Sequence, residues 1–158
     1  MKHLPKHLQP RWRYLAVAIE TWPDADLTRR SFQRAVWYAT RNLLGDPGSA
    51  DADTTVIRFD HADAAGHAIV RVRRGHTDAA RAALACIDTV DDDTVGLRVT
   101  GTSGTVRACE EKYIRGPAKS PVQRHVVFDD TDREAVARGR RVDVRTGEGF
   151  VGATTLDI

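Results

Sequence analysis

The sequence predicts an α+β fold in which one small domain follows the order β-α-β-β-α-β and carries an extra helix after its fourth strand. Three observations predict it. Short stretches alternate apolar and polar residues, as half-buried strands do. The stretches between them repeat their apolar residues at helical spacing, and glycine, proline or aspartate marks the junctions. A chain of 158 residues has room for one such domain and an appendage.

The first strand is expected at residues 12–20, because apolar side chains alternate with others along it. Leu15, Val17 and Ile19 fall on one face, which we expect to lie on the core. The sequence Trp22-Pro23-Asp24 then predicts a turn.

The first helix is expected to begin after Asp26 or Thr28, either of which can cap it, and to run to about Leu44. Gly45-Asp46-Pro47-Gly48 should end it, since glycine and proline interrupt helices. Its apolar residues are spaced for one helical face. They are Phe32, Ala35, Val36, Ala39 and Leu43.

The other elements complete the domain. We expect strands at residues 55–60, 67–74 and 95–100, a helix at 77–87 capped by Thr77, and the extra helix at about 105–115. Both crossovers are long enough to carry a helix, as parallel strands require. This order predicts a ferredoxin-like sandwich, in which the first and third strands are central.

Two appendages flank the domain. Residues 1–10 are predicted to form a basic, extended arm, and residues 11–116 to form the ferredoxin-like domain. Residues 117–158 change in character and predict a loosely ordered C-terminal extension. Within it, Val122–Phe128 can form a strand and Thr131–Arg138 a short helix.

Alternation assigns the two faces of the sheet. The residues expected to face the helices are Leu15, Val17, Ile19, Ala68, Val70, Val72, Val95, Leu97 and Val99. The opposite face is mainly aromatic and basic, with Trp12, Tyr14, Arg58, Ile69, Arg71, Arg73 and Arg98. Such a face is typical of folds that bind single-stranded RNA, because guanidinium groups bind phosphate and stack on bases. The other interpretation is that the last helix or a protein partner covers this face, which the small Ala16 and Ala18 favour.

Charge is distributed unevenly, although the net charge is only +2 and the pI about 8.7. The first 13 residues hold Lys2, Lys6, Arg11 and Arg13 and no acidic residue. This arm is either a solvated terminus or a segment that becomes ordered on RNA phosphates. The many aspartates and few lysines also suggest a salt-adapted source, although genomic base composition can produce the same bias.

The two cysteines, Cys86 and Cys109, each lie in an apolar helical pattern and are expected to be buried thiols. No apolar run approaches the length of about 18 residues that suggests a membrane span. We therefore expect a soluble, intracellular protein.

A second candidate site is the turn Gly101–Thr105, which opens the extra helix. Backbone N–H groups and the helix dipole favour an anion there, and Arg107 adds charge. The turn lacks the Gly-Lys-Ser/Thr sequence of a nucleotide-phosphate loop. An ordinary helix cap explains it equally well.

Signatures of an independent enzyme are weak. His3 and His7 have helical spacing for a metal, but Pro5 lies between them. His61 and His67 flank an acidic loop, where solvation explains them. No Ser/His/Asp or Cys/His arrangement can be nominated.

Several segments, taken together, indicate a family. They are Lys2-His3-Leu4-Pro5, Arg11–Leu15, Ile69–Arg73, Gly101–Cys109 and Tyr113-Ile114. In order and spacing they resemble the ribonuclease P protein component 2 family, the archaeal relatives of a eukaryotic Pop-type subunit of that enzyme. The resemblance covers about residues 2–116, and Gly101–Cys109 is its most specific part.

The resemblance implies a ferredoxin-like fold and a cytoplasmic ribonucleoprotein that removes 5′ leaders from precursor tRNA. In that enzyme the RNA is the catalyst and uses magnesium, so the family implies no cofactor bound by the protein and no independent activity. It implies as partners the ribonuclease P RNA, protein component 3 in a two-plus-two assembly, and precursor tRNA indirectly, but no membrane.

The resemblance and the charge pattern together nominate RNA-binding residues. They are Lys2, Lys6, Arg11, Arg13, Tyr14, Arg71, Arg73, Gly104, Thr105 and Arg107. No catalytic or metal-binding residue is nominated. By alternation Arg13 falls on the helix side of the first strand, so Arg11 and Tyr14 are the better candidates for direct contact.

The alternative function is a ferredoxin-like regulatory or small-ligand domain that acts through oligomerisation. Such a domain needs a polar pocket rather than an acid-free arm and a basic face, and the sequence identifies no such pocket. We therefore expect an RNA-binding subunit.

Overall fold

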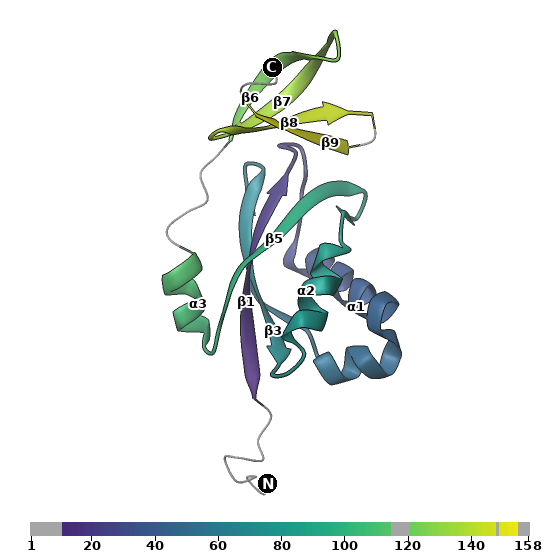
Figure 1. The fold of residues 1–158 in the computed structure, drawn as a ribbon, viewed down its shortest axis with the longest axis vertical. Helices are drawn as coiled ribbons and strands as arrows, with labels where there is room; N and C mark the ends of the chain where they lie inside the picture. Colours follow the sequence, from purple (N-terminus) through teal and green to yellow (C-terminus); the bar gives the residue numbers. More distant parts are fainter. Residues whose placement is uncertain (1–10, 115–120, 148, 155–158) are drawn as a thin grey trace, which may run out of the picture.

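The computed structural model describes residues 11–114, 121–147 and 149–154. The described residues form nine strands and three helices, and the strands are divided between two antiparallel sheets (Figure 1). The first sheet lies with the helices, and the second sheet lies beyond one end of it. Within the described residues, no helix is long and apolar enough to cross a membrane.

The first sheet has the strand order β2-β3-β1-β5-β4, and each neighbouring pair is antiparallel. Its strands are Trp12–Thr21 (β1), Thr55–Ala62 (β2), Ala65–Arg73 (β3), Thr89–Val90 (β4) and Asp93–Ser103 (β5). The first and third strands of the chain are therefore central. The short β4 was not predicted, because two residues are too few to show alternation.

Two helices, Arg29–Ala52 (α1) and Thr77–Ala85 (α2), cover one face of this sheet, and the third, Val106–Tyr113 (α3), lies against the other face (Figure 1). The prediction of the core face is confirmed. All nine sheet residues expected to face the helices belong to the main core cluster or pack against it. Phe32 and Val36 of α1 and Leu84 of α2 belong to the same cluster.

Helix α1 begins where the sequence predicts and is interrupted at the predicted glycine, but a second helical segment follows. Thr28 is the N-cap, and its side chain and that of Ser31 form a reciprocal capping box. The predicted end near Leu44 coincides with a break at Gly45, whose φ of 74° and ψ of 172° are not helical. A second helical segment, which the sequence did not predict, continues from there to Ala52. Pro47 follows closely on that break, near the start of a new helical segment, where its missing N–H costs little.

Two predictions about α2 and its end need correction. Thr77 does not cap α2; the N-cap is His76, without a capping side-chain hydrogen bond, and Thr77 is the first helical residue. Cys86 is exposed rather than buried, because it lies just beyond the last residue of α2. Cys109 is buried, and desolvation, helped by Glu110, raises the pKa of its thiol to about 11.

The second sheet replaces the loosely ordered extension that the sequence predicts. Its strands are Val122–Phe128 (β6), Thr131–Arg138 (β7), Arg141–Thr146 (β8) and Gly149–Thr154 (β9), paired in chain order. The short helix predicted over β7 is wrong. Asp129 and Asp130 adopt positive φ angles of 50° and 58° and close a two-residue hairpin that pairs β7 with β6. The sheet has a core of its own around Val126, Ala135, Val142 and Val144.

Arg138 joins the two sheets. Its side chain is only 8% exposed and donates to the backbone oxygens of Thr21 (2.6 Å) and Ala64 (2.8 Å) at the end of the first sheet. It also pairs with Asp143 of its own sheet at 2.7 Å. The second sheet is thus held against the first by a nearly buried guanidinium group whose three nitrogens each donate a hydrogen bond.

Candidate nucleic-acid interface

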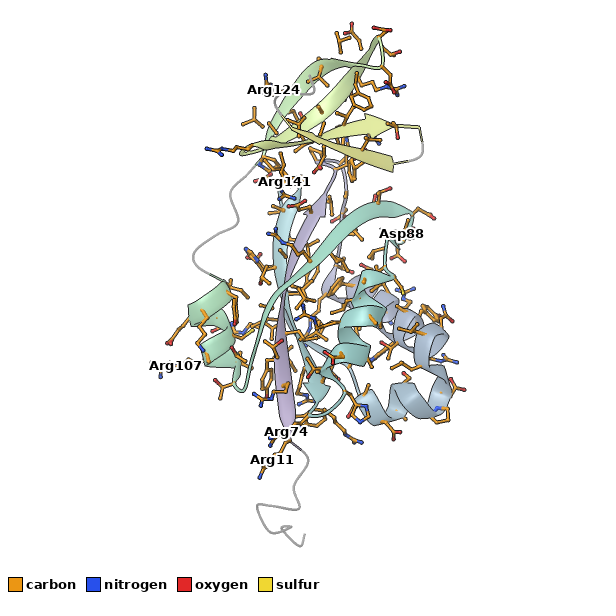
Figure 2. The ribbon with its side chains drawn as sticks, viewed as in Figure 1. Arg11, Arg74, Asp88, Arg107, Arg124 and Arg141 are labelled. Atoms are coloured by element: carbon orange, nitrogen blue, oxygen red, sulfur yellow. The ribbon has the colours of Figure 1, made fainter. Side chains whose placement is uncertain are left out.

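Arginines gather at the end of the first sheet that lies away from the second sheet. Arg11 precedes β1 and Arg74 follows β3, and the Arg74 N–H donates to the Arg11 carbonyl oxygen (2.8 Å). The first turn of α3 lies at the same end, because α3 follows β5 and the last residues of β5 pair with the start of β1. Figure 2 shows Arg11, Arg74 and Arg107 toward this end of the molecule. We call Arg11, Arg13, Arg71, Arg73, Arg74 and Arg107 the basic end.

The ring of Trp12 contacts the guanidinium groups of two of these arginines. The guanidinium carbon of Arg71 lies 4.1 Å from the centre of the Trp12 ring system and that of Arg73 lies 5.7 Å from it. Arg73 also approaches Asp53 at 3.7 Å. The buried Nε atoms of both arginines have no hydrogen-bond partner among the described residues. Stacking therefore orients the two guanidinium groups while leaving donors unused.

The turn before α3 contributes to the basic end as a helix cap. Thr105 is the N-cap, and its side chain accepts a hydrogen bond from the Ala108 N–H (3.1 Å). A side chain at Gly104 would meet the Arg13 guanidinium at 3.6 Å, so this turn and Arg13 are neighbours. Arg107 is well exposed and pairs with Glu111 one helical turn later (2.9 Å). The cap explanation is confirmed, and it is compatible with an anion at the same turn.

Tyr14 lies elsewhere than the open-face interpretation expects. It packs beneath α3 in a small cluster built on Ala16, Ile69 and Cys109. A Cβ at Gly101 would lie 2.0 Å from the ring of Tyr113, so β5 needs glycine to let α3 approach. The structure therefore supports the interpretation in which the last helix covers this part of the sheet.

The nominated residues are only partly brought together. Arg11, Arg13, Arg71, Arg73, Gly104, Thr105 and Arg107 lie toward the basic end, whereas Lys2 and Lys6 lie outside the described residues. On the same sheet face, Arg98 is exposed, and Arg58 is paired with Glu110 of α3 at 2.9 Å. Sequence reasoning missed Arg74 as a site residue, although the Arg73-Arg74 doublet before Gly75 signals a basic strand end.

A different surface lies on the helix side. A groove of about 420 Å³ runs between α1 and the segment that follows α2, with Tyr38, Leu43 and Cys86 in its lining. Tyr38 is 55% and Leu43 46% exposed. Large apolar side chains exposed in one patch are typical of a protein–protein contact. Across the described residues, no group of three or more His, Cys, Asp or Glu side chains could hold a metal ion.

Taken together, the basic end defines this chain as a protein with a surface suited to a phosphate-rich polyanion. Residues 13–114 match the sequence model of the Rpp14/Pop5 family. The chain is 65% identical over 159 residues to the ribonuclease P protein component 2 of Haloarcula marismortui, with 99% of each chain covered. It belongs to the Rpp14/Pop5 family, and the resemblance seen in its sequence is confirmed.

Two further relatives match different shares of the chain. The protein of the same name from Halorubrum lacusprofundi is 61% identical over 157 residues, with 99% of each chain covered. That from Thermococcus kodakarensis is 33% identical over 113 residues, which are 72% of this chain and 91% of that protein. The family match ends at residue 114, so the second sheet lies outside the part that defines the family.

Proposed function

We propose that this chain is a protein subunit of ribonuclease P and that its basic end contacts the RNA of that enzyme. Family membership and the names of its relatives support the first part. The observation that carries the second is the stacking of Arg71 on Trp12 next to Arg11 and Arg74. The regulatory-domain alternative is not favoured by these comparisons.

In this role the protein supports the RNA while the RNA removes 5′ leaders from precursor tRNA in the cytoplasm. Magnesium serves the RNA, and the protein needs no cofactor of its own. We assign the first sheet and its helices to the ferredoxin-like class, because the order β2-β3-β1-β5 and the helices α1 and α2 on one face are what that class requires.

The groove between α1 and the segment after α2 is proposed as the contact for protein component 3, in a two-plus-two assembly. Its exposed apolar residues support a protein rather than an RNA partner. Tyr38→Asp should weaken co-purification with component 3. Val122→Asp, which changes an exposed valine of the second sheet, should leave it unchanged.

RNA binding by the basic end is tested by its salt dependence. The double variant Arg11→Gln/Arg74→Gln should bind the ribonuclease P RNA more weakly than the unchanged protein. The slope of log affinity against log salt should fall by about one unit for each phosphate that the variant no longer neutralises. Fluorescence anisotropy over a salt series measures both quantities.

The matched control is Arg30→Gln/Arg81→Gln, which removes the same charge from exposed positions on α1 and α2. This variant should keep the affinity and the slope of the unchanged protein. An equal loss in both double variants would show that only net charge matters and would contradict the assignment of the basic end.

A further inference from the structure

The strand β4 lies at one edge of the first sheet, where it pairs with β5 alone. Its register places Thr89 opposite Thr94, and one step earlier the Val95 N–H donates to the Asp88 oxygen (2.9 Å). Hydrogen-bonded and non-hydrogen-bonded pairs alternate along antiparallel strands. Thr89 therefore belongs to a non-hydrogen-bonded pair, and its N–H and carbonyl oxygen point away from β5.

These two backbone groups of Thr89 are available to a partner. The residue is exposed, and within the described part of the chain no hydrogen bond to its N–H or carbonyl oxygen is formed from outside the β4–β5 pair. An unpaired N–H and C=O at the edge of a sheet are a template for another strand. Thr89 can thus exchange two hydrogen bonds with one residue of an added strand.

The groove between α1 and the segment after α2 runs beside this edge. Thr89 and Ile87 line it on one side, and Tyr38 and Leu43 of α1 line it on the other. Val90, the next residue of β4, points into the core beneath the helices, so Thr89 points to the opposite face. In an added strand, the two neighbours of the residue paired with Thr89 would therefore point toward the helices and into the groove.

The charge of the groove favours a basic protein segment. Asp88 and Asp91 line it, are exposed, and form no ion pair with a described residue. Arg34, on the α1 side, is the one cation among the residues that line the groove. Figure 2 shows Asp88 far from Arg11 and Arg74 of the basic end. The two carboxylates repel phosphate groups and attract a lysine or arginine, so this surface is unsuited to RNA.

We propose that an extended segment of a partner protein adds a strand to β4 at Thr89. Two alternate apolar side chains of the segment enter the groove, and a lysine or arginine lies beside Asp88 and Asp91. The proposal rests on the proposed function, since it specifies which kind of segment of protein component 3 occupies the groove. A partner helix satisfies its own backbone groups and would leave those of Thr89 unpaired.

Two variants of one residue test the strand addition. Thr89→Pro removes the N–H at the edge, where proline is tolerated because this N–H has no partner in the sheet. Thr89→Ala keeps the N–H and changes only the side chain. In titration calorimetry with purified component 3, Thr89→Pro should raise the Kd about tenfold, because a hydrogen bond is lost and its acceptor is left unpaired. Thr89→Ala should leave the Kd within about twofold.

Hydrogen exchange of the full, unchanged chain provides a second readout. The Thr89 amide should exchange at least about tenfold more slowly in the complex with component 3 than in the free protein, because a strand partner accepts its hydrogen bond. The amides of β7, in the second sheet, should exchange at the same rate in both.

Each outcome decides the proposal. If component 3 binds but the Thr89 amide is not protected, a helix or a loop occupies the groove, and the strand addition is wrong while the proposed function stands. Equal losses of affinity in Thr89→Pro and Thr89→Ala would assign the effect to the side chain and overturn the proposal. If component 3 does not bind the unchanged protein, the proposed contact with component 3 fails as well.

Discussion

At the scale of single residues, Gly101 decides whether α3 can lie on the sheet. A Cβ at this position would overlap the Tyr113 ring, with distances of 2.0–2.5 Å to three of its carbons. Gly101→Ala should therefore destabilise the protein by roughly 1–3 kcal/mol, the usual cost of overpacking, in urea unfolding. Gly96→Ala is the matched control in the same strand, where the nearest atoms would lie 3.9 Å away. Similar losses in the two variants would mean that strand propensity, not the approach of α3, is responsible.

His61 gives the fold a dependence on pH. Its Nε2 lies 2.8 Å from the Thr21 hydroxyl. Burial lowers its pKa below 6.5, although Asp26, Asp93 and Asp60 act in the opposite direction. The unfolded chain then binds the proton more readily, so this contribution to stability is present above about pH 6.5 and is lost as the pH falls through that value.

The measurement is the urea midpoint at a series of pH values between about 7.5 and 5.5. His61→Gln should flatten the fall of the midpoint toward low pH, because its amide does not titrate in this range. His67→Gln is the control, a histidine of the same hairpin. An unchanged pH profile in His61→Gln would show that other groups cause the dependence.

At the scale of elements, the start of α1 was predictable because it depends on neighbours in sequence. Thr28 accepts from the Ser31 N–H while the Ser31 hydroxyl accepts from the Thr28 N–H, each at 3.0 Å. Thr28→Ala should cost about 1 kcal/mol of stability. Thr77→Ala at the first residue of α2 should cost less, because no hydrogen bond of Thr77 caps that helix. Chemical denaturation of both variants checks the difference, and equal losses would contradict the capping role of Thr28.

The core face of the first sheet was also predictable, since alternation along a strand is local information. Coverage of the opposite face was one of two interpretations, favoured by the small Ala16 and Ala18. The choice between them depends on the tertiary approach of α3, for which Gly101 leaves room beside Tyr113. For the same reason Tyr14 was nominated for RNA contact although it packs beneath α3.

The strand β7 shows a second reason why prediction from sequence failed. Its residues Thr131–Arg138 fit a short helix by composition, yet they form a strand because the Asp129-Asp130 turn pairs them with β6. Tertiary pairing overrode a weak local preference.

The basic end was predicted only in part. Arginines at the ends of strands can be recognised in the sequence, whereas the stacking of Arg71 on Trp12 depends on the register of the sheet.

At the scale of the whole molecule, the junction of the two sheets depends on arginines. Arg138 donates to two backbone oxygens of the first sheet and pairs with Asp143. Arg141 pairs with Glu20 of β1, whose hydrogen bond raises the pKa of the Arg141 guanidinium further. The Arg141 pair is half-exposed and contributes little, whereas the nearly buried Arg138 should carry most of the polar energy of the junction.

Arg138→Met tests this ranking. It keeps much of the length of the side chain but takes the donor away from the Thr21 oxygen and the Asp143 carboxylate, while the Ala64 oxygen keeps only the Thr21 N–H. This should cost about 3 kcal/mol or more. Hydrogen exchange should locate the loss: amides of β6 to β9 should lose protection while those of β1 and β3 keep theirs, because each sheet has its own core. Arg140→Met, an exposed neighbour in the same turn, should leave both sheets protected. If the two variants behave alike, the sheets are held together by apolar contact around Trp22 instead.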